Sequence, residues 1–303
     1  MSDHDHHDHQ HDHHQHGHGD PKQEQDQRIA ETLANVRYKF LVMSGKGGVG
    51  KSTVSVNLAV ALAKAGWKVG LMDVDLTGPS VPGLLGLDGA QAEFDGTRVH
   101  PIVHSENLKV LSIAHLIDLS DKAVIWRGPM KIGAIRQFLA DIEWGDLDFM
   151  IIDCPPGTSD EPLTVAQTFT GVQAIVVTTP QEIALTDVRK SVHFCQKVNM
   201  PILGVIENLS GYTCPQCGHF EELFKTGGGE KLAAQFNVRF LGRLPIDPAV
   251  VRAGDLGEPY LALNADSATA KAFAQIADTI FEIAKTLPVE RPGYTPIQFV
   301  KSR

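Results

Sequence analysis

The chain has 303 residues, of which 43% are hydrophobic and 21% are charged, and its formal net charge is −9. This composition is that of a globular protein with a sizeable core, and it excludes a fibrous repeat or disorder along the whole chain. We find no apolar run near the roughly 20 residues that span a bilayer, no segment like a signal peptide, and no excess of positive charge for nucleic-acid binding. We therefore expect a cytoplasmic protein of one domain with tails, with neither a membrane nor a nucleic acid as partner.

The first segment, residues 1–28, is rich in histidine and aspartate. Nine of the fourteen histidines and five aspartates lie in its first twenty residues, which contain almost no apolar side chain. Such a segment cannot offset the entropy lost on ordering, so we expect a disordered arm. Flexible histidine-rich tracts chelate nickel, zinc or copper, and the alternative is a solubilising tail; composition leaves both open.

From Tyr38 onward, short apolar runs alternate with helical patterns. The runs are mostly continuous, as in strands that are covered on both faces of a parallel sheet, and the apolar spacing between them predicts crossover helices. The predicted fold class is therefore α/β, a doubly wound and mostly parallel sheet over residues 29–287, followed by a tail at 288–303. In such folds ligands bind at the carboxyl ends of the strands. The predicted strands contain residues 40–43, 69–72, 110–113, 149–152, 174–177 and 202–206.

The strongest motif directly follows the first predicted strand. Residues 45–52 read G-K-G-G-V-G-K-S, which fits the phosphate-loop pattern G-x-x-x-x-G-K-[ST]. Glycines let the backbone wrap around a phosphate, Lys51 adds charge at the β- and γ-phosphates, and the Ser52 hydroxyl holds Mg²⁺. The order of strand, loop, Lys-Ser and helix favours nucleotide binding over a glycine-rich turn without a ligand. The predicted nucleotide-binding residues of this loop are Gly45, Lys46, Gly47, Gly48, Val49, Gly50, Lys51, Ser52 and Thr53.

A second lysine, Lys46, lies inside the loop, where an ordinary phosphate loop needs none. Residues 46–53 match K-G-G-x-G-K-[ST] without a gap, and here the chain resembles the deviant Walker A group, the relatives of MinD, ParA and the nitrogenase iron protein. In that group the first lysine reaches across a dimer interface to the partner's nucleotide. The resemblance implies a homodimer, whereas a solvated loop lysine is the alternative.

Two carboxylates at predicted strand ends complete the hydrolytic site. Asp75 follows the second strand and Asp153 follows the run 149–152. Hydrolysis needs an oriented water and a metal ion that offsets the charge developing on the γ-phosphate. We assign Asp75 to the water and Asp153 to Mg²⁺, with the capping of a turn or helix as the alternative for each. The predicted catalytic residues are Lys46, Lys51, Asp75 and Asp153.

The four cysteines include one C-x-x-C pair, Cys214 and Cys217. In a C-P-x-C-G knuckle both sulfurs can bind one metal while backbone N–H groups point toward them. A zinc site or a cubane cluster needs four ligands, so a second copy of the chain is the simplest source of the other two. Spacing alone leaves zinc and an iron-sulfur cluster both open, and a redox dithiol or an inert turn is a weaker alternative. We expect Cys154 and Cys195 to be packed inside the fold.

Together these motifs resemble the Mrp/ApbC group of ATP-dependent iron-sulfur cluster carriers, relatives of the eukaryotic cytosolic scaffolds, over residues 36–287. The resemblance implies a dimer whose paired C-x-x-C motifs hold a bridging [4Fe-4S] cluster and pass it to apoproteins. It implies ATP and Mg²⁺ as cofactors, and adenine contacts by Asn208 and Pro245. Slow hydrolysis would suit such a switch. Cys154 departs from the family, which usually has an aliphatic or Met residue there.

Two other interpretations stay open. A spatial-organisation ATPase of the MinD or ParA kind needs a basic membrane-seeking helix or a basic DNA-binding face, and the closing helix has few basic residues. A zinc-knuckle ATPase that binds a partner would use the cysteine pair structurally. A metal-insertion GTPase would find a use for the histidine arm, but the sequence has no N-K-x-D guanine motif.

Overall fold

The computed structural model describes residues 21–116, 128–214 and 216–288. The strands of the main sheet are β1 Val36–Ser44, β2 Val69–Asp73, β5 Ile102–Ser105, β6 Leu108–Ser112, β7 Leu147–Asp153, β8 Gln173–Thr178, β9 Ile202–Glu207 and β12 Phe240–Arg243. Two small hairpins pair β3 Glu93–Phe94 with β4 Val99–His100, and β10 Tyr212–Thr213 with β11 Phe220–Glu221. The helices are α1 Pro21–Ala34, α2 Lys51–Lys64, α3 Val81–Leu84, α4 Gly128–Asp141, α5 Asp160–Thr168, α6 Glu182–Lys197, α7 Gly228–Gln235, α8 Pro248–Asp255, α9 Tyr260–Leu263 and α10 Ala268–Ala284, with a 3₁₀ turn at Ile113–His115.

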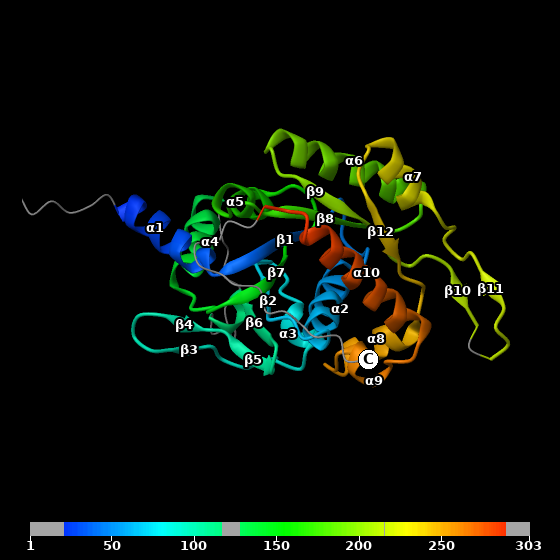
Figure 1. Cartoon of the computed structure of the whole chain (residues 1–303), viewed down its shortest axis with the longest axis horizontal. Coiled ribbons are helices and arrows are strands. Elements are labelled where there is room, and N and C mark those ends of the chain that lie inside the picture. Colours follow the sequence, from blue (N-terminus) through cyan, green and yellow to red (C-terminus); the bar gives the residue numbers. More distant parts are fainter. Residues whose placement is uncertain (1–20, 117–127, 215, 289–303) are drawn as a thin grey trace, which may run out of the picture.

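The main sheet has eight strands in the order β12-β9-β8-β1-β7-β2-β6-β5. Seven of them run parallel, and only β5 pairs antiparallel, with β6 at the edge. Helices cover both faces of the sheet (Figure 1). The predicted class, a doubly wound and mostly parallel α/β fold, is confirmed, and all six predicted strands are present.

Side chains of the central strands divide between two hydrophobic cores. In β1, Phe40 and Val42 pack into the core that contains α2 and α10, whereas Leu41 and Met43 pack into the core on the other face. Every residue of β7 is buried. A strand covered on both faces has no solvent side, which is why its sequence is a continuous apolar run rather than an alternating one.

Helix α1 corrects the predicted boundary of the arm. It begins at Pro21, so residues 21–28 are helical and belong to the folded part of the chain. Ile29 and Leu33 of this helix are buried in the same core as α4, and Arg28 pairs with Asp141. The polar sequence before Ile29 concealed the helix, because only its last two turns supply apolar contacts. Residues 1–20, with the predicted metal-chelating histidines, and the tail beyond residue 288 lie outside the described residues.

The carboxyl ends of four parallel strands meet at one edge of the sheet. There β1 ends at Ser44, β2 at Asp73, β7 at Asp153 and β9 at Glu207. The register places Asp153 opposite Val42 on one side and opposite Asp73 on the other. Because β7 lies between β1 and β2, its terminal carboxylate is brought directly beside the loop that leaves β1.

Candidate nucleotide site and cysteine hairpin

The loop between β1 and α2 has the backbone of a phosphate loop. Gly48 and Gly50 have φ of +79° and +78°, in the left-handed region that glycine adopts without strain. Helix α2 begins at the next residue, Lys51, so its first N–H groups and the positive end of its dipole face the loop. Gly45 approaches α6 so closely that an added Cβ would lie 2.2 Å from the backbone carbon of Asp187.

A cavity of about 330 Å³ lies against this loop. Seven of the nine predicted loop residues line it, together with Asp75 and Pro156. Gly45 does not line the cavity, and the Val49 side chain is buried in the core. The structure therefore brings seven of the predicted phosphate-binding residues and Asp75 around one hollow, which Gly45 and Val49 do not line.

A buried network joins the loop to the end of β7. Lys51 Nζ lies 2.6 Å from Asp153 Oδ2, and the two side chains are 7% and 0% exposed. The same carboxylate accepts hydrogen bonds from Ser52 Oγ and Ser55 Oγ, both at 2.6 Å. Hydroxyl and carboxylate oxygens are ligands that Mg²⁺ accepts, so Ser52 and Asp153 fit the predicted metal site. Ser55 was missed in the sequence, although its position one helical turn after Lys51 places it on the same face of α2.

Asp75 lies in the phosphate cavity but also closes a turn. Its Oδ1 accepts hydrogen bonds from the backbone N–H and the hydroxyl of Thr77, at 3.1 and 2.9 Å, and from the N–H of Gly78 at 3.1 Å. These contacts form the aspartate turn that was the alternative interpretation of this residue. The turn and the position in the cavity are compatible, because the turn holds the carboxylate at the cavity wall.

Asp73 is fully buried at the end of β2. Its Oδ1 accepts from the Asp75 N–H at 3.0 Å, and its Oδ2 accepts from the Val81 N–H and the Ser112 hydroxyl, both at 3.3 Å. Burial, with the neighbouring Asp153 carboxylate second, raises the pKa of Asp73 to about 7. This side chain ties together both ends of the loop that carries Asp75.

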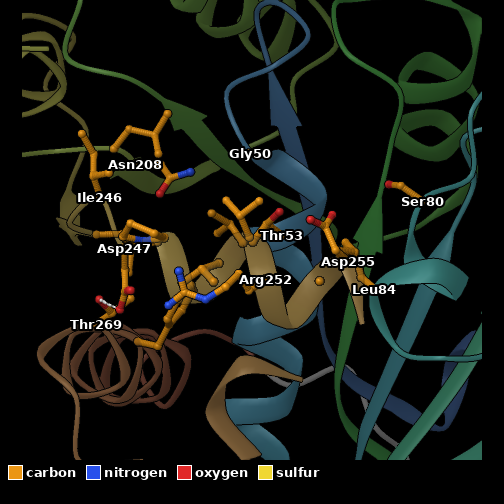
Figure 2. A pocket seen from close by; sticks show the side chains of 18 of the residues that line it. Gly50, Thr53, Ser80, Leu84, Asn208, Ile246, Asp247, Arg252, Asp255 and Thr269 are labelled. Atoms are coloured by element: carbon orange, nitrogen blue, oxygen red, sulfur yellow. Dashed lines mark hydrogen bonds between the residues drawn. The ribbon is translucent and has the colours of Figure 1, made fainter. Parts of the chain in front are cut away.

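A larger cavity of about 990 Å³ continues from the phosphate loop. Figure 2 shows Asn208 near one side of it, Ser80 and Leu84 on the other, and Thr53 of α2 between them. Asn208 and Pro245, the predicted base contacts, both line this cavity. Asn208 Nδ2 donates to the Val49 carbonyl at 2.9 Å, which uses one of its two amide hydrogens and leaves the amide oxygen able to accept a hydrogen bond from a ligand.

The far wall of this cavity was missed in the sequence. It is formed by α8 and the residue that caps it, Asp247, whose Oδ1 accepts from the Ala249 N–H at 2.9 Å. Asp247 Oδ2 accepts from the hydroxyl of Thr269 at 3.0 Å (Figure 2). It also accepts from the hydroxyl of Tyr260. The Asp-Pro start of α8 is a recognisable helix cap, but nothing local links it to a ligand site.

Cys214 and Cys217 lie on the β10–β11 hairpin, which projects from the main body (Figure 1). Cys217 is exposed and Cys214 is half-buried. Hydrogen bonds between Cys214 and both Gly218 and His219, at 2.9 Å, close the predicted knuckle. Hydrogen bonding from the backbone N–H groups of Cys217 and Gln216 holds the pKa of the Cys214 thiol below its ordinary value.

The other two cysteines belong to the main body of the fold, where Cys154 directly follows β7 and Cys195 lies in α6. Cys154 and Cys195 are both fully buried, as predicted, and burial raises the pKa of each thiol. Within the described part of the chain, no three His, Cys, Asp or Glu side chains are grouped as a metal site would require. Of the described residues, a single chain therefore offers two accessible thiols at the hairpin. None of the described helices has both the length and the apolar character needed to cross a bilayer.

Comparisons with known proteins show the family of the chain. A ParA family model described as NUBPL iron-transfer P-loop NTPase matches residues 35–281. An iron-sulfur cluster carrier protein from Saccharolobus solfataricus is 45% identical, with 86% of this chain and 88% of the relative covered. A protein of the same name from Methanocaldococcus jannaschii is also 45% identical, with 85% and 88% covered.

Solved structures show the same fold. A nucleotide-binding protein from Archaeoglobus fulgidus, in complex with ADP, superposes with a TM-score of 0.69 at 38% identity, over 78% of this chain and 92% of that one. The cell division ATPase MinD from Pyrococcus furiosus superposes with a TM-score of 0.60 at 26% identity, over 81% and 99%.

Proposed function

Because the chain belongs to the family of NUBPL iron-transfer P-loop NTPases, we propose that it is an ATP-dependent carrier of iron-sulfur clusters. One observation carries the proposal: the same chain has a phosphate loop with a buried Lys51–Asp153 pair and a separate, accessible pair of thiols. The first suits a nucleotide switch and the second suits a metal cargo that is bound and released. The names of the relatives, iron-sulfur cluster carrier proteins, support this cargo.

The nucleotide chemistry follows from the contacts of Lys51. The ammonium is paired with Asp153, and the β- and γ-phosphates of ATP compete for the same charge. Ser52 and Asp153 would hold Mg²⁺, which supplies charge neutralisation at the γ-phosphate. Asp75, held at the wall of the phosphate cavity, orients the attacking water. Asn208 accepts a hydrogen bond from the exocyclic amino group of adenine through its amide oxygen.

The cargo requires a second copy of the chain. A [4Fe-4S] cluster takes four thiolates, and two hairpins that meet across a dimer interface provide them from Cys214 and Cys217 of each chain. Lys46, which lines the phosphate cavity, reaches the nucleotide of the partner. Each round of binding and hydrolysis then changes how the two hairpins meet, and the cluster passes to an apoprotein. Slow hydrolysis suits this switch.

The test is the metal and sulfide content of the full-length protein, purified without oxygen. We expect about four iron and four sulfide per dimer, as one shared cluster demands, and loss of both in Cys217→Ala. Cys195→Ala is the matched control, because this thiol lies in the core and should leave the cluster in place. Sulfide is the decisive quantity, since the histidines of the arm bind metal ions but not sulfide.

Two other metal and sulfide contents would contradict the proposal. One zinc per dimer without sulfide would make the hairpin a structural zinc knuckle, and the protein would then be an ATPase that binds a partner through it. A full complement of iron and sulfide in Cys217→Ala would show that the cluster does not bridge the two hairpins.

A further inference from the structure

A single buried carboxylate fastens both ends of the cysteine hairpin. Glu207, the last residue of β9, is 0% exposed. Its Oε1 accepts from the Ser210 hydroxyl at 2.6 Å and from the Gly227 N–H at 2.8 Å, and its Oε2 accepts from the Gly229 N–H at 2.5 Å. Ser210 precedes the hairpin, whereas Gly227 and Gly229 follow it. Residues 211–226 are therefore a loop whose two roots meet at one side chain.

The carboxylate has little freedom to move within this arrangement. It lies at the N-terminus of α7, where the helix dipole favours a negative charge. A Cβ added to Gly229 would lie 3.1 Å from both Glu207 and Thr178, so the helix start is packed tightly on β8 and β9. Arg243 Nε, on a half-exposed side chain, lies 3.5 Å from Oε1. Any displacement of Glu207 must therefore displace the roots of the hairpin with it.

The next residue along the chain belongs to the nucleotide site. Asn208 donates its backbone N–H to Thr178 at 2.7 Å and its side-chain amide to Val49 of the phosphate loop at 2.9 Å. An added Cβ on Gly50 would lie 2.4 Å from this amide nitrogen, so Asn208 packs directly on the loop. A shift of the phosphate loop on nucleotide binding therefore acts on the residue adjacent to Glu207.

The backbone strengthens the link. Leu244 N–H donates to the Glu207 carbonyl at 2.8 Å, and the Ser210 N–H donates to the Leu244 carbonyl at 2.9 Å. Leu244 lines the larger cavity, which contains Asn208. The wall of that cavity and the root of the hairpin are thus joined by backbone hydrogen bonds. Between them Leu209 has φ of +56°, a left-handed conformation that is unfavourable for a non-glycine residue and that the surrounding contacts must hold.

We propose that Glu207 is the positioning residue through which the nucleotide at the Asn208–phosphate loop contact controls the geometry of Cys214 and Cys217. The inference rests on the proposed function and names the physical link that such a carrier needs. Nucleotide binding shifts Asn208 relative to Val49, Glu207 follows because it is the preceding residue, and both roots of the hairpin are displaced together. Coupling of this kind is reciprocal, so cargo on the thiols changes nucleotide affinity by the same factor.

The experiment uses the full-length protein after its bound metal and cluster have been removed with a chelator, and measures how fast its thiols are alkylated, with and without Mg²⁺ and a non-hydrolysable ATP analogue. Cys154 and Cys195 are fully buried, so the native protein is labelled at the hairpin. We expect the nucleotide to change the wild-type rate by about fivefold or more, the lower bound for coupled sites. In Glu207→Gln the response should fall below about twofold while the affinity for the analogue stays within about threefold. Glu221→Gln, an exposed carboxylate on β11, is the matched control and should respond like the wild type.

Three results would overturn the inference: a wild-type protein whose thiols ignore the nucleotide, a full response in Glu207→Gln, or a response that falls only in step with nucleotide affinity. If Glu207→Gln does not fold, Ser210→Ala removes one of the three hydrogen bonds to the Glu207 carboxylate and serves as the test. An undiminished response in Ser210→Ala also overturns the inference.

The sulfide content of the purified protein separates a failure of this inference from a failure of the proposed function. Wild-type protein that holds the cluster as purified but shows no response after the cluster is removed refutes only the coupling, and protein that responds but holds no sulfide as purified refutes only the cargo.

Discussion

Lys51 and Asp153 are 102 residues apart in the chain, and their charged groups meet at 2.6 Å in the interior of the protein. The pair is the point where the phosphate loop is joined to the sheet. It also holds the Lys51 ammonium at a place where the phosphates of a bound triphosphate can compete with Asp153 for it. Breaking such a pair by removing one partner leaves an uncompensated buried charge, whereas removing both does not.

Replacing Lys51 by methionine should therefore have two effects. Nucleotide binding is lost, and the free energy of unfolding without nucleotide falls by about 3 kcal/mol because the Asp153 carboxylate keeps only its two serine donors. The double variant Lys51→Met/Asp153→Asn should lose less than the sum of the two single variants, by about 1 kcal/mol or more. Urea denaturation of the four proteins measures this difference. Strict additivity would contradict a direct pair.

Substitution of Lys46 tests whether two chains share each nucleotide site. Its side chain lines the phosphate cavity but has a partner-directed role in our proposal. Lys46→Ala should bind the ATP analogue with an affinity within about threefold of wild type and should lose hydrolysis and nucleotide-dependent dimerisation. Lys190→Ala, at an exposed position on α6, is the control. Sedimentation with and without the analogue gives the oligomeric state. Normal dimerisation and hydrolysis in Lys46→Ala would leave this lysine a solvated loop residue.

The Cys214 thiol should react at an unusually low pH. Backbone N–H groups of Cys217 and Gln216 stabilise its thiolate and hold its pKa below the ordinary value. In Cys217→Ala these N–H groups remain, so the alkylation rate of Cys214 should rise with a midpoint below about 8.5, the pKa of an unperturbed cysteine. In concentrated urea the turn is lost and the midpoint should return to that value. Equal midpoints in the native and unfolded protein would contradict the hydrogen-bonded knuckle.

Asp73 should give the fold a distinct pH dependence. Its pKa is raised to about 7 by burial and by Asp153, whereas an unfolded chain has an aspartate pKa of about 3.9. The native state therefore binds the proton more tightly, and the contribution of Asp73 to stability is fully present below pH of about 4 and is lost as the pH rises to about 7. Above that pH the contribution is constant.

The measurement is the free energy of unfolding of wild type minus that of Asp73→Asn across this range, without nucleotide. We expect the difference to fall between pH values of about 4 and 7, because asparagine cannot titrate. Asp278→Asn, at an exposed position on α10, controls for the loss of a carboxylate at the surface. A flat difference for Asp73→Asn would show that Asp73 is ionised throughout.

Much of the fold was predictable because its signals are local. A strand buried on both faces must be a short continuous apolar run, and residues 149–152 could be assigned to β7 on that basis alone. The phosphate loop is local in the same sense, since left-handed backbone at Gly48 and Gly50 needs glycine there. The cysteine knuckle is closed by hydrogen bonds within residues 214–219.

Helix α1 and the roles of Ser55, Asp247 and Glu207 were not found because they depend on distant partners. The polar sequence of α1 acquires its helix through contacts with α4, which tertiary packing supplies. Glu207 looks like any acidic residue at a strand end until the hairpin returns and presents Gly227 and Gly229 to it. Nothing in the local spacing shows which backbone N–H groups a buried carboxylate will meet.

The sequence by itself determined the class of the protein: a mostly parallel α/β fold, a phosphate loop with two lysines and a C-x-x-C pair of thiols. Only the tertiary structure decided that β7 lies between β1 and β2, which puts Asp153 on Lys51, and that one carboxylate closes the cysteine hairpin beside the base cavity. The reason is physical. Apolar runs and glycines constrain the conformation of their own segment, whereas strand order and the pairing of buried charges are set by how all segments share the two cores.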